Sequence, residues 1–226
     1  NEDTEEILLN GPEMAAGFSY YGIGGRSVSP DNSLLAYGID TVSRRRYTIY
    51  FKNLKTGELL PDVLSNTSGG ATWANDNKTV FYTKKDPITL RTDKVYKHVI
   101  GTDQSEDVLV FEEKDETYST YVYKTKSHKF IVIGSSSTLS SEFRIISADK
   151  PYGDWRVIQP REDNLEYSLA HYGDYFYIQT NKDDAINFKL MKTPVNKTTK
   201  ENWVDVIMNT HLRLRILRWS LMWCIR

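Results

Sequence analysis

Three histidines, His98, His128 and His171, are the side chains of this sequence that could best support catalysis. Each could act as a general base toward one of the many serines, with an aspartate orienting the imidazole. Their surroundings favour structural roles instead. His98 falls within a predicted strand, and His128 and His171 fall in or beside predicted turns. We therefore predict no catalytic residue in this chain.

The serine nucleophile of an α/β-hydrolase needs a G-x-S-x-G elbow between a strand and a helix. The string Gly25-Arg26-Ser27 begins such a motif, but Ser29 stands where the second glycine is required. This string also falls within a predicted strand. Without the elbow, no strained turn exposes a serine beside an oxyanion hole. The 226 residues are therefore not expected to hydrolyse peptides on their own.

Metal and ligand sites are not predicted either. Four histidines and the single cysteine, Cys224, have no metal-ligand spacing, so neither a metal nor a cofactor is expected. Two charged groups could bind a basic peptide or an anion, and both fall between predicted strands, where solvated charges are common. They are the acidic group Glu112, Glu113, Asp115 and Glu116, and the basic group Arg44, Arg45 and Arg46. We predict that both groups are solvated.

Composition narrows the class of protein. A net charge of −1 gives no electrostatic argument for binding to nucleic acid or to an anionic membrane. The sequence has no run of about 18 apolar residues, so no membrane span is expected. A single cysteine excludes an intramolecular disulfide. We expect a cytoplasmic location. The periplasm stays an alternative, because the chain begins at Asn1 and its true start is not visible.

A strand pattern that recurs four times must position these side chains. Its copies are SLLAYG (33–38), KTVFYT (78–83), KFIVIG (129–134) and YFYIQT (175–180), at offsets of 45, 51 and 46 residues. A second strand follows each copy, and further strands precede and follow the pair. A repeat of four strands at this spacing is typical of a propeller blade. The sequence therefore predicts an all-β fold, a β-propeller with about four consecutive four-stranded blades.

The predicted blades cover 16–64, 65–114, 115–162 and 163–208, within a partial propeller over 1–208. Residues 5–10 are predicted to be the last strand of a preceding blade. Trp155 and Trp203 recur at an offset of 48, which favours packing between blades over ligand stacking. Trp73 is also expected on a strand.

The tail, 209–226, has no blade pattern and contains four arginines and no acid. It is predicted to be foreign to the fold, through a shifted reading frame or as a cloning remnant. The alternatives are a basic amphipathic segment that contacts a membrane or a partner, and a strand that covers an open sheet edge.

Several strings resemble one known family. SPDNSLLAYGIDTVSRRRYTIYFKNLKTGELLPD (29–62), TWANDNKTVFYTKKDP (72–87) and VYKHVIGTDQSEDVLVFEEKDETY (95–118) resemble the propeller of the prolyl oligopeptidase family. TNKDDAINFKLMKTP (180–194) and ENWVDVI (201–207) support the same resemblance. The chain is most similar to the oligopeptidase B, or protease II, branch, and the resemblance covers residues 5–208.

This resemblance implies a seven-bladed propeller that caps an α/β-hydrolase domain with a Ser-Asp-His triad. It also implies cleavage of short peptides after Arg or Lys, with the propeller restricting access to the catalytic cavity. The chain departs from the family because it lacks the first blades and the hydrolase domain and diverges after residue 208. We therefore expect the substrate-access part of a peptidase, inactive alone.

Two alternatives stay open. The chain could be a stand-alone propeller that binds peptides or proteins, or a closed four-bladed propeller. An open arc of four blades would expose faces that expect neighbours, so it would be prone to self-association.

Overall fold

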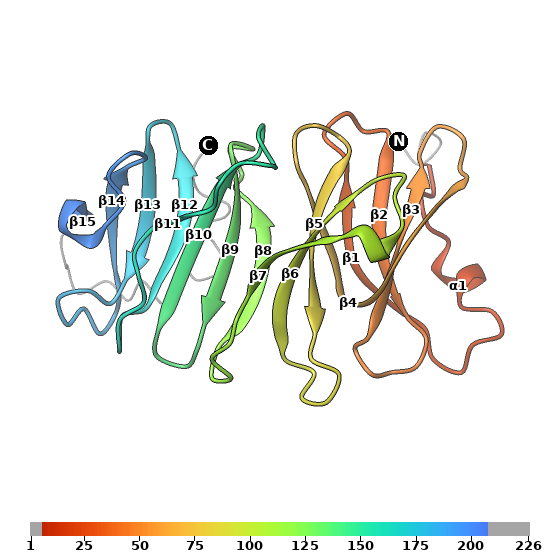
Figure 1. Cartoon of the computed structure of the whole chain (residues 1–226), viewed down its shortest axis with the longest axis horizontal. Coiled ribbons are helices and arrows are strands. Elements are labelled where there is room, and N and C mark those ends of the chain that lie inside the picture. Colours follow the sequence, from red (N-terminus) through yellow and green to blue (C-terminus); the bar gives the residue numbers. More distant parts are fainter. Residues whose placement is uncertain (1–5, 208–226) are drawn as a thin grey trace. The chain divides into compact units, whose positions relative to one another are not determined.

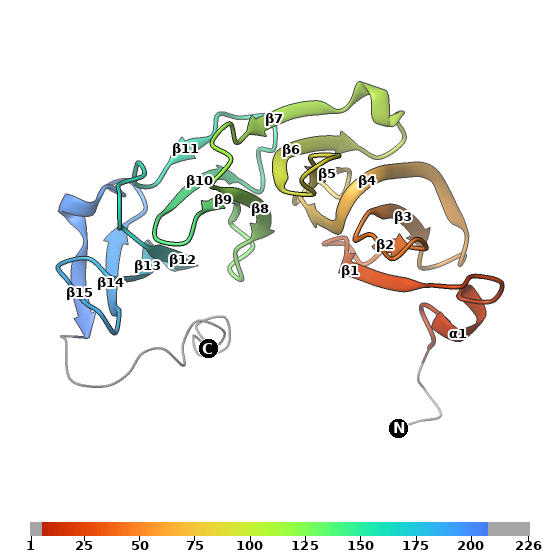
Figure 2. The ribbon, with the colours of Figure 1, turned by 90° about the horizontal axis from the view of Figure 1, so that it is seen from below.

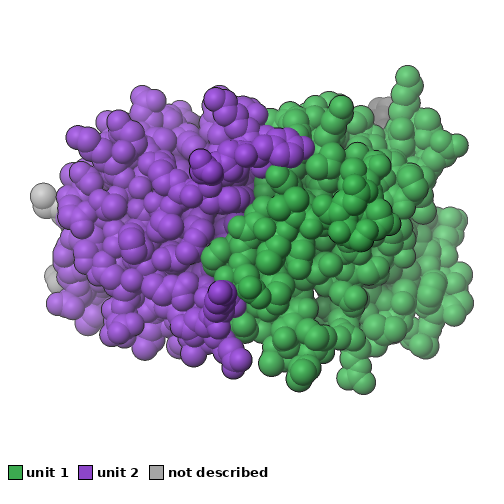
Figure 3. Space-filling view, viewed as in Figure 1, with its two compact units in different colours: residues 1–112 green, residues 113–226 purple. Residues whose placement is uncertain are grey.

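The computed structural model describes residues 6–207, and it is built almost entirely of antiparallel strands (Figure 1). This confirms the predicted all-β class. The chain divides into two compact units, residues 1–112 and 113–226, coloured separately in Figure 3. Within the described residues, no helix is both long enough and apolar enough to cross a membrane.

Unit 1 contains one continuous seven-stranded antiparallel sheet whose strands follow the order of the sequence. The strands are β1 (Gly22–Val28), β2 (Leu34–Asp40), β3 (Tyr47–Asn53), β4 (Leu59–Trp73), β5 (Thr79–Lys85), β6 (Thr92–Val99) and β7 (Val108–Glu112). Two short helices accompany them, the helix α1 (Gly11–Met14) and the 3₁₀ helix η2 (Gln104–Glu106).

Unit 2 contains two four-stranded antiparallel sheets, with the orders β11-β10-β9-β8 and β12-β13-β14-β15. The first has β8 (Ser119–Lys124), β9 (Phe130–Ser136), β10 (Ser141–Ser147) and β11 (Arg156–Val157). The second has β12 (Tyr167–Tyr172), β13 (Tyr175–Thr180), β14 (Lys189–Pro194) and β15 (Val204–Ile207), with the 3₁₀ helix η3 (Lys200–Asn202) before β15. The four recurring strand cores of the sequence are thus β2, β5, β9 and β13.

Strand β4 serves two blades at once. It pairs with β3 up to Thr67 and with β5 from Thr67 onward. The backbone bends around Thr67, because Asn66 (φ 58°) and Gly69 (φ 95°) have positive φ. Asn and Gly adopt this left-handed conformation most easily. Figure 2 shows the resulting curve of β4 between its two neighbours. The predicted boundary between 64 and 65 therefore lies inside one bent strand, with no connecting loop.

Strands in the middle of each blade are apolar on both faces because both faces are covered. In β5, for example, all five residues from Thr79 to Thr83 are buried, as are Ile131, Val132 and Ile133 of β9. Strands covered on both faces lose the alternation of polar and apolar residues. The core of unit 2 joins both of its sheets, since Phe143 of β10 and Phe176 of β13 belong to one buried cluster.

Three hairpins share one turn conformation. Asn32, Asn77 and His128 occupy equivalent positions, each with φ between 57° and 59°. Asparagine tolerates this left-handed conformation better than most residues. One hydrogen bond connects the first of these turns to the second, since the Asp31 N–H donates to Asn77 Oδ1 at 2.9 Å. The turn residues therefore repeat for a backbone reason that the sequence pattern already indicated.

The expected strand over residues 5–10 is not present in its described part. Residues 6–10 have no strand assignment, and Asn10 caps α1, with its side chain accepting the Glu13 N–H. A strand needs a hydrogen-bonded neighbour, and no described strand pairs with this segment. The prediction for the tail, 209–226, lies outside the described residues.

Candidate functional site

His98 lies in β6 with its side chain fully buried. Its Nδ1 is 2.7 Å from Asp107 Oδ1, and its Nε2 is 3.1 Å from Asp62 Oδ1. Because both ring nitrogens contact carboxylates, neither is left to accept a proton from a serine. The structure confirms that His98 lies within a strand, and it places the side chain at a packed position.

Sequence reasoning missed the two aspartates that surround His98. A signal for them existed in β6, where Asp93, Val95 and His98 are the buried positions. A histidine among buried strand positions must find hydrogen-bond partners inside the protein. Those partners lie 36 residues earlier and 9 residues later in the chain. The strand pattern therefore indicates that His98 needs hydrogen-bond partners, but it does not indicate which residues they are.

His128 is exposed in the turn between β8 and β9. Its backbone N–H donates to the Thr125 carbonyl at 2.9 Å, and its φ is 57°. It therefore helps to build the blade turn, as predicted.

His171, near the end of β12, contacts a serine side chain. Its Nδ1 is 2.7 Å from Ser127 Oγ, although the two residues are 44 positions apart. Ser127 Oγ is also 2.9 Å from Thr125 Oγ1 and accepts the Lys129 N–H at 3.4 Å. This hydroxyl stands in a turn between two strands and not at a strand-to-helix elbow, so it has no adjacent oxyanion hole of the hydrolase type.

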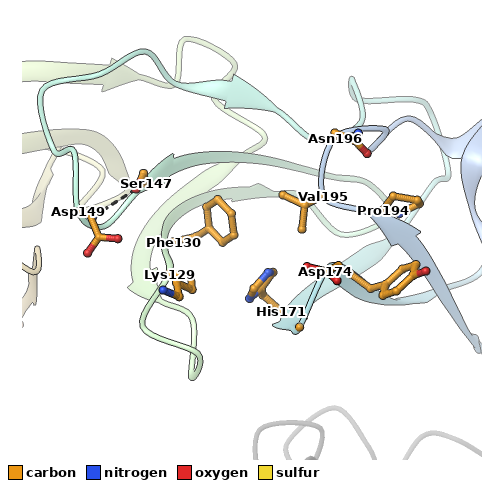
Figure 4. Close-up of a pocket in the computed structure, with 11 residues that line it drawn as sticks. Lys129, Phe130, Ser147, Asp149, His171, Asp174, Pro194, Val195 and Asn196 are labelled. Carbon is orange, nitrogen blue, oxygen red and sulfur yellow. Dashed lines mark hydrogen bonds between the residues drawn. The ribbon is translucent and has the colours of Figure 1, made fainter.

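A pocket of about 540 Å³ opens beside His171, at the end of unit 2 where the turns gather. Six of its lining residues are Lys129, Phe130, Asp149, His171, Asp174 and Val195. Figure 4 shows Phe130, His171 and Val195 at its centre, with Lys129 and Asp149 on one side and Asp174 on the other. The pocket therefore has an apolar centre and a charged rim.

The imidazole in this pocket is a poor candidate for a charged group. Burial lowers the pKa of His171, and nearby Lys129 lowers it further, which together outweigh the opposite effect of Asp174. Phe130 packs edge-on against the ring, with the centroids 4.8 Å apart. An apolar centre with a few polar groups around it is the lining typical of a ligand pocket.

One member of the acidic group is not solvated, contrary to prediction. Glu113 is buried and forms a bidentate pair with Arg161, at 2.7 and 3.4 Å. The guanidinium also lies 4.0 Å from the centroid of the Tyr118 ring. Arg161 follows 48 residues later, so no local sequence pattern indicates this partner. The pair stabilises unit 2 and is not a binding site.

The arginine group lies in an exposed turn between β2 and β3, as predicted. The buried Asp40 carboxylate organises this turn by accepting backbone N–H groups, including those of Arg44 and Arg45.

The two recurring tryptophans, Trp155 and Trp203, lie beside strands and not on them. Trp203 lies one residue before β15 instead of on it, and it packs against Tyr167 at 5.3 Å between centroids. Trp155 likewise precedes β11. Among residues 6–207, no group of three or more His, Cys, Asp or Glu side chains is arranged to hold a metal ion.

Comparison with known proteins finds one family. The model of the family described as "Prolyl oligopeptidase, N-terminal beta-propeller domain" matches residues 1–215. Dipeptidyl aminopeptidase BI of Pseudoxanthomonas mexicana is 45% identical over 201 residues, which cover 89% of this chain and 28% of that protein. Protease 2 of Moraxella lacunata is 36% identical over 205 residues, covering 89% of this chain and 29% of that protein.

The fold agrees with solved structures of the same family. Oligopeptidase B from Leishmania major superimposes with a TM-score of 0.84 at 28% sequence identity, covering 91% of this chain and 29% of that one. The chain thus spans less than a third of the length of these relatives.

Proposed function

Since this chain belongs to the prolyl oligopeptidase family and matches the N-terminal β-propeller domain of that family, we propose that it forms the substrate-access part of a serine peptidase that acts on short peptides. The observation that carries the proposal is the match to protease 2 and dipeptidyl aminopeptidase BI along 89% of the chain. The repeated blades supply a rigid wall, and the catalytic serine is supplied by a part of the protein outside these residues.

Cleavage after Arg or Lys is the more specific part of the proposal. It is supported by the likeness to protease 2 and to oligopeptidase B. A second candidate is removal of dipeptides from a free amino terminus, which the 45% identity to a dipeptidyl aminopeptidase favours. Both candidates place this chain in the same access role, and we propose a cytoplasmic location for either.

Two reporter peptides separate these activities in the full-length protein that carries this chain. An amino-blocked arginyl reporter is cleaved only by an endopeptidase that accepts arginine. A dipeptide reporter with a free amino terminus reports the dipeptidyl activity. A serine-reactive phosphonate should abolish whichever cleavage is found. Absence of cleavage of both reporters would overturn the peptidase proposal and favour a stand-alone peptide-binding propeller.

A further inference from the structure

A charged cluster in unit 1 has no part in the proposed function. His98 lies between Asp62 and Asp107, whose side chains are 2% and 1% exposed. Ionised carboxylates only accept hydrogen bonds, so both imidazole nitrogens must carry hydrogen for both contacts to form. The two distances therefore fit a doubly protonated His98 that donates one hydrogen bond to each carboxylate.

The surroundings fix this arrangement from several elements. Tyr82 of β5 donates its hydroxyl to Asp107 Oδ2 at 2.6 Å, and the Gly101 N–H donates to Asp62 Oδ1 at 2.5 Å. Phe51 of β3 stacks on the imidazole, with 6.0 Å between centroids. The other charged group near the cluster is Asp103, whose pKa is lowered mainly by its hydrogen bonds with Ser105 and slightly by His98.

The cluster joins two neighbouring blades of unit 1. Asp62 lies in the part of β4 that pairs with β3, because the adjacent residues Val63 and Leu64 pair with Tyr50 and Ile49. His98 lies in β6 of the next blade, and Asp107 directly precedes β7.

A second contact runs alongside. Gln104 accepts the Ser65 N–H at 3.0 Å and donates to the Ser65 carbonyl at 3.1 Å. The segment 100–107 is therefore fastened to β4 at two places, one neutral and one charged.

We propose that Asp62, His98 and Asp107 form a proton-dependent latch that holds the segment 100–107 against β4 and releases it when His98 loses its proton. A neutral imidazole can donate to only one carboxylate. The other aspartate would then face a lone pair, and the two buried carboxylates would lose the charge that separates them. The inference does not depend on the proposed function, because it concerns only the joining of two blades.

The pKa of His98 gives the direction of the switch. Burial alone lowers this pKa, but the hydrogen bonds and charges of Asp107 and then Asp62 raise it above its ordinary value. Because the folded pKa is the higher one, the stabilising contribution is complete below the unfolded pKa of about 6.5. It is lost as the pH rises through the folded pKa. The latch is therefore closed below the unfolded pKa and opens as the pH rises through the folded pKa of His98.

Hydrogen exchange of the full chain, followed by mass spectrometry from about pH 6 to about pH 9, tests the latch. Rates are corrected for intrinsic exchange at each pH. We expect protection of peptides covering 100–107 and 62–67 to fall about tenfold per pH unit across the window between the unfolded and folded pKa values. Peptides covering β9 in unit 2 are the internal reference and should keep their protection.

Variants separate a proton switch from a merely structural contact. His98→Gln should give low, pH-independent protection of 100–107. Asp62→Asn preserves the shape and leaves His98 one carboxylate, so its folded pKa should fall, and the loss of protection should end at a lower pH and be smaller in total. His128→Gln, which changes an exposed turn histidine, should behave as the unmodified chain. Protection of 100–107 that does not change with pH, or an unaltered pH profile in His98→Gln or Asp62→Asn, would overturn the proposal.

Discussion

The indole N–H of Trp73 donates to the backbone carbonyl of Ser27 at 3.1 Å, across a separation of 46 residues. Unit 2 has a counterpart, in which the Tyr123 hydroxyl donates to the Leu169 carbonyl at 3.0 Å, also across 46 residues. The separation is close to the spacing of the sequence repeat, whose offsets are 45, 51 and 46 residues. Neighbouring blades within each unit are thus joined by side chains of their first strands.

Replacing Trp73 with Phe should weaken unit 1. The Phe ring keeps part of the edge contact with Phe51, which now has its centroid 5.8 Å away, but it cannot donate to Ser27. The lost hydrogen bond and volume should cost about 2 kcal/mol in the free energy of unfolding. Chemical denaturation measures this cost. Tyr172→Phe, at a residue 54% exposed, is the control and should leave stability unchanged.

Gly38 should tolerate no side chain. A Cβ there would lie 2.3 Å from the Gly69 carbonyl oxygen, which is backbone and cannot rotate away. We expect Gly38→Ala to cost about 3 kcal/mol, since β2 and β4 must move apart. The matched control is Gly70→Ala, where a Cβ would meet nothing within 4 Å. Equal melting temperatures for the two variants would contradict this account of how closely β2 and β4 approach.

Arg161→Ala should destabilise unit 2 by about 3 kcal/mol, because it leaves Glu113 buried without its partner. Arg161→Lys should cost less, since it keeps the charge but loses the bidentate contact and the stacking on Tyr118. Denaturation of both variants at neutral pH provides the comparison. Similar stability of the alanine variant and the unmodified chain would show that the pair contributes little.

The Glu113–Arg161 pair should also make the stability of unit 2 fall at low pH. Burial raises the pKa of Glu113, but the hydrogen bond from Arg161 and further contacts lower it below its usual value. Its contribution is therefore present above the unfolded pKa of about 4.3 and is lost as the pH falls through the folded pKa. Arg161→Ala should remove this acid-side loss, which a series of melting curves at decreasing pH would detect.

Ser127→Ala tests the prediction that this chain supplies no catalytic residue. The change removes the contact with His171 Nδ1 and should cost about 1 kcal/mol of stability. In the full-length protein, kcat and KM for a peptide reporter should stay unchanged. His171→Gln provides a second test at the other partner. A loss of kcat with unchanged folding in either variant would assign chemistry to this pair.

The fold followed from sequence wherever a strand is covered on both faces. The run YFYIQT matches β13, Tyr175–Thr180. Most of its residues are aromatic or β-branched, which favours a strand, and most of them are buried or half-buried. The bend in β4 was not predictable in the same way. The chain passes from one blade to the next through this bend, with Asn66 and Gly69 at positive φ, and not through a loop. Asn and Gly also occur in ordinary turns, so their presence does not distinguish a bent strand from a turn.

Charged partners were the part of the structure that sequence could not supply. His98 and Glu113 are both buried, yet their charged partners lie far away in the chain or outside its strands: Asp62 is in β4, Asp107 comes just before β7, and Arg161 lies between β11 and β12. Periodicity reports which face a residue occupies, not which distant side chain it meets. The solvation predicted for Glu113 was wrong because its partner Arg161 could not be identified from the sequence, whereas the strand position predicted for His98 was confirmed.

We propose that this chain is the substrate-access domain of a serine peptidase. The most direct test measures kcat/KM of the full-length protein for arginine-containing peptides of increasing length, ending with a long, permanently unfolded chain. We predict efficient, phosphonate-sensitive cleavage of the short peptides and a steep fall in kcat/KM as length increases. Equal kcat/KM for the short peptides and the long unfolded chain would contradict the claim.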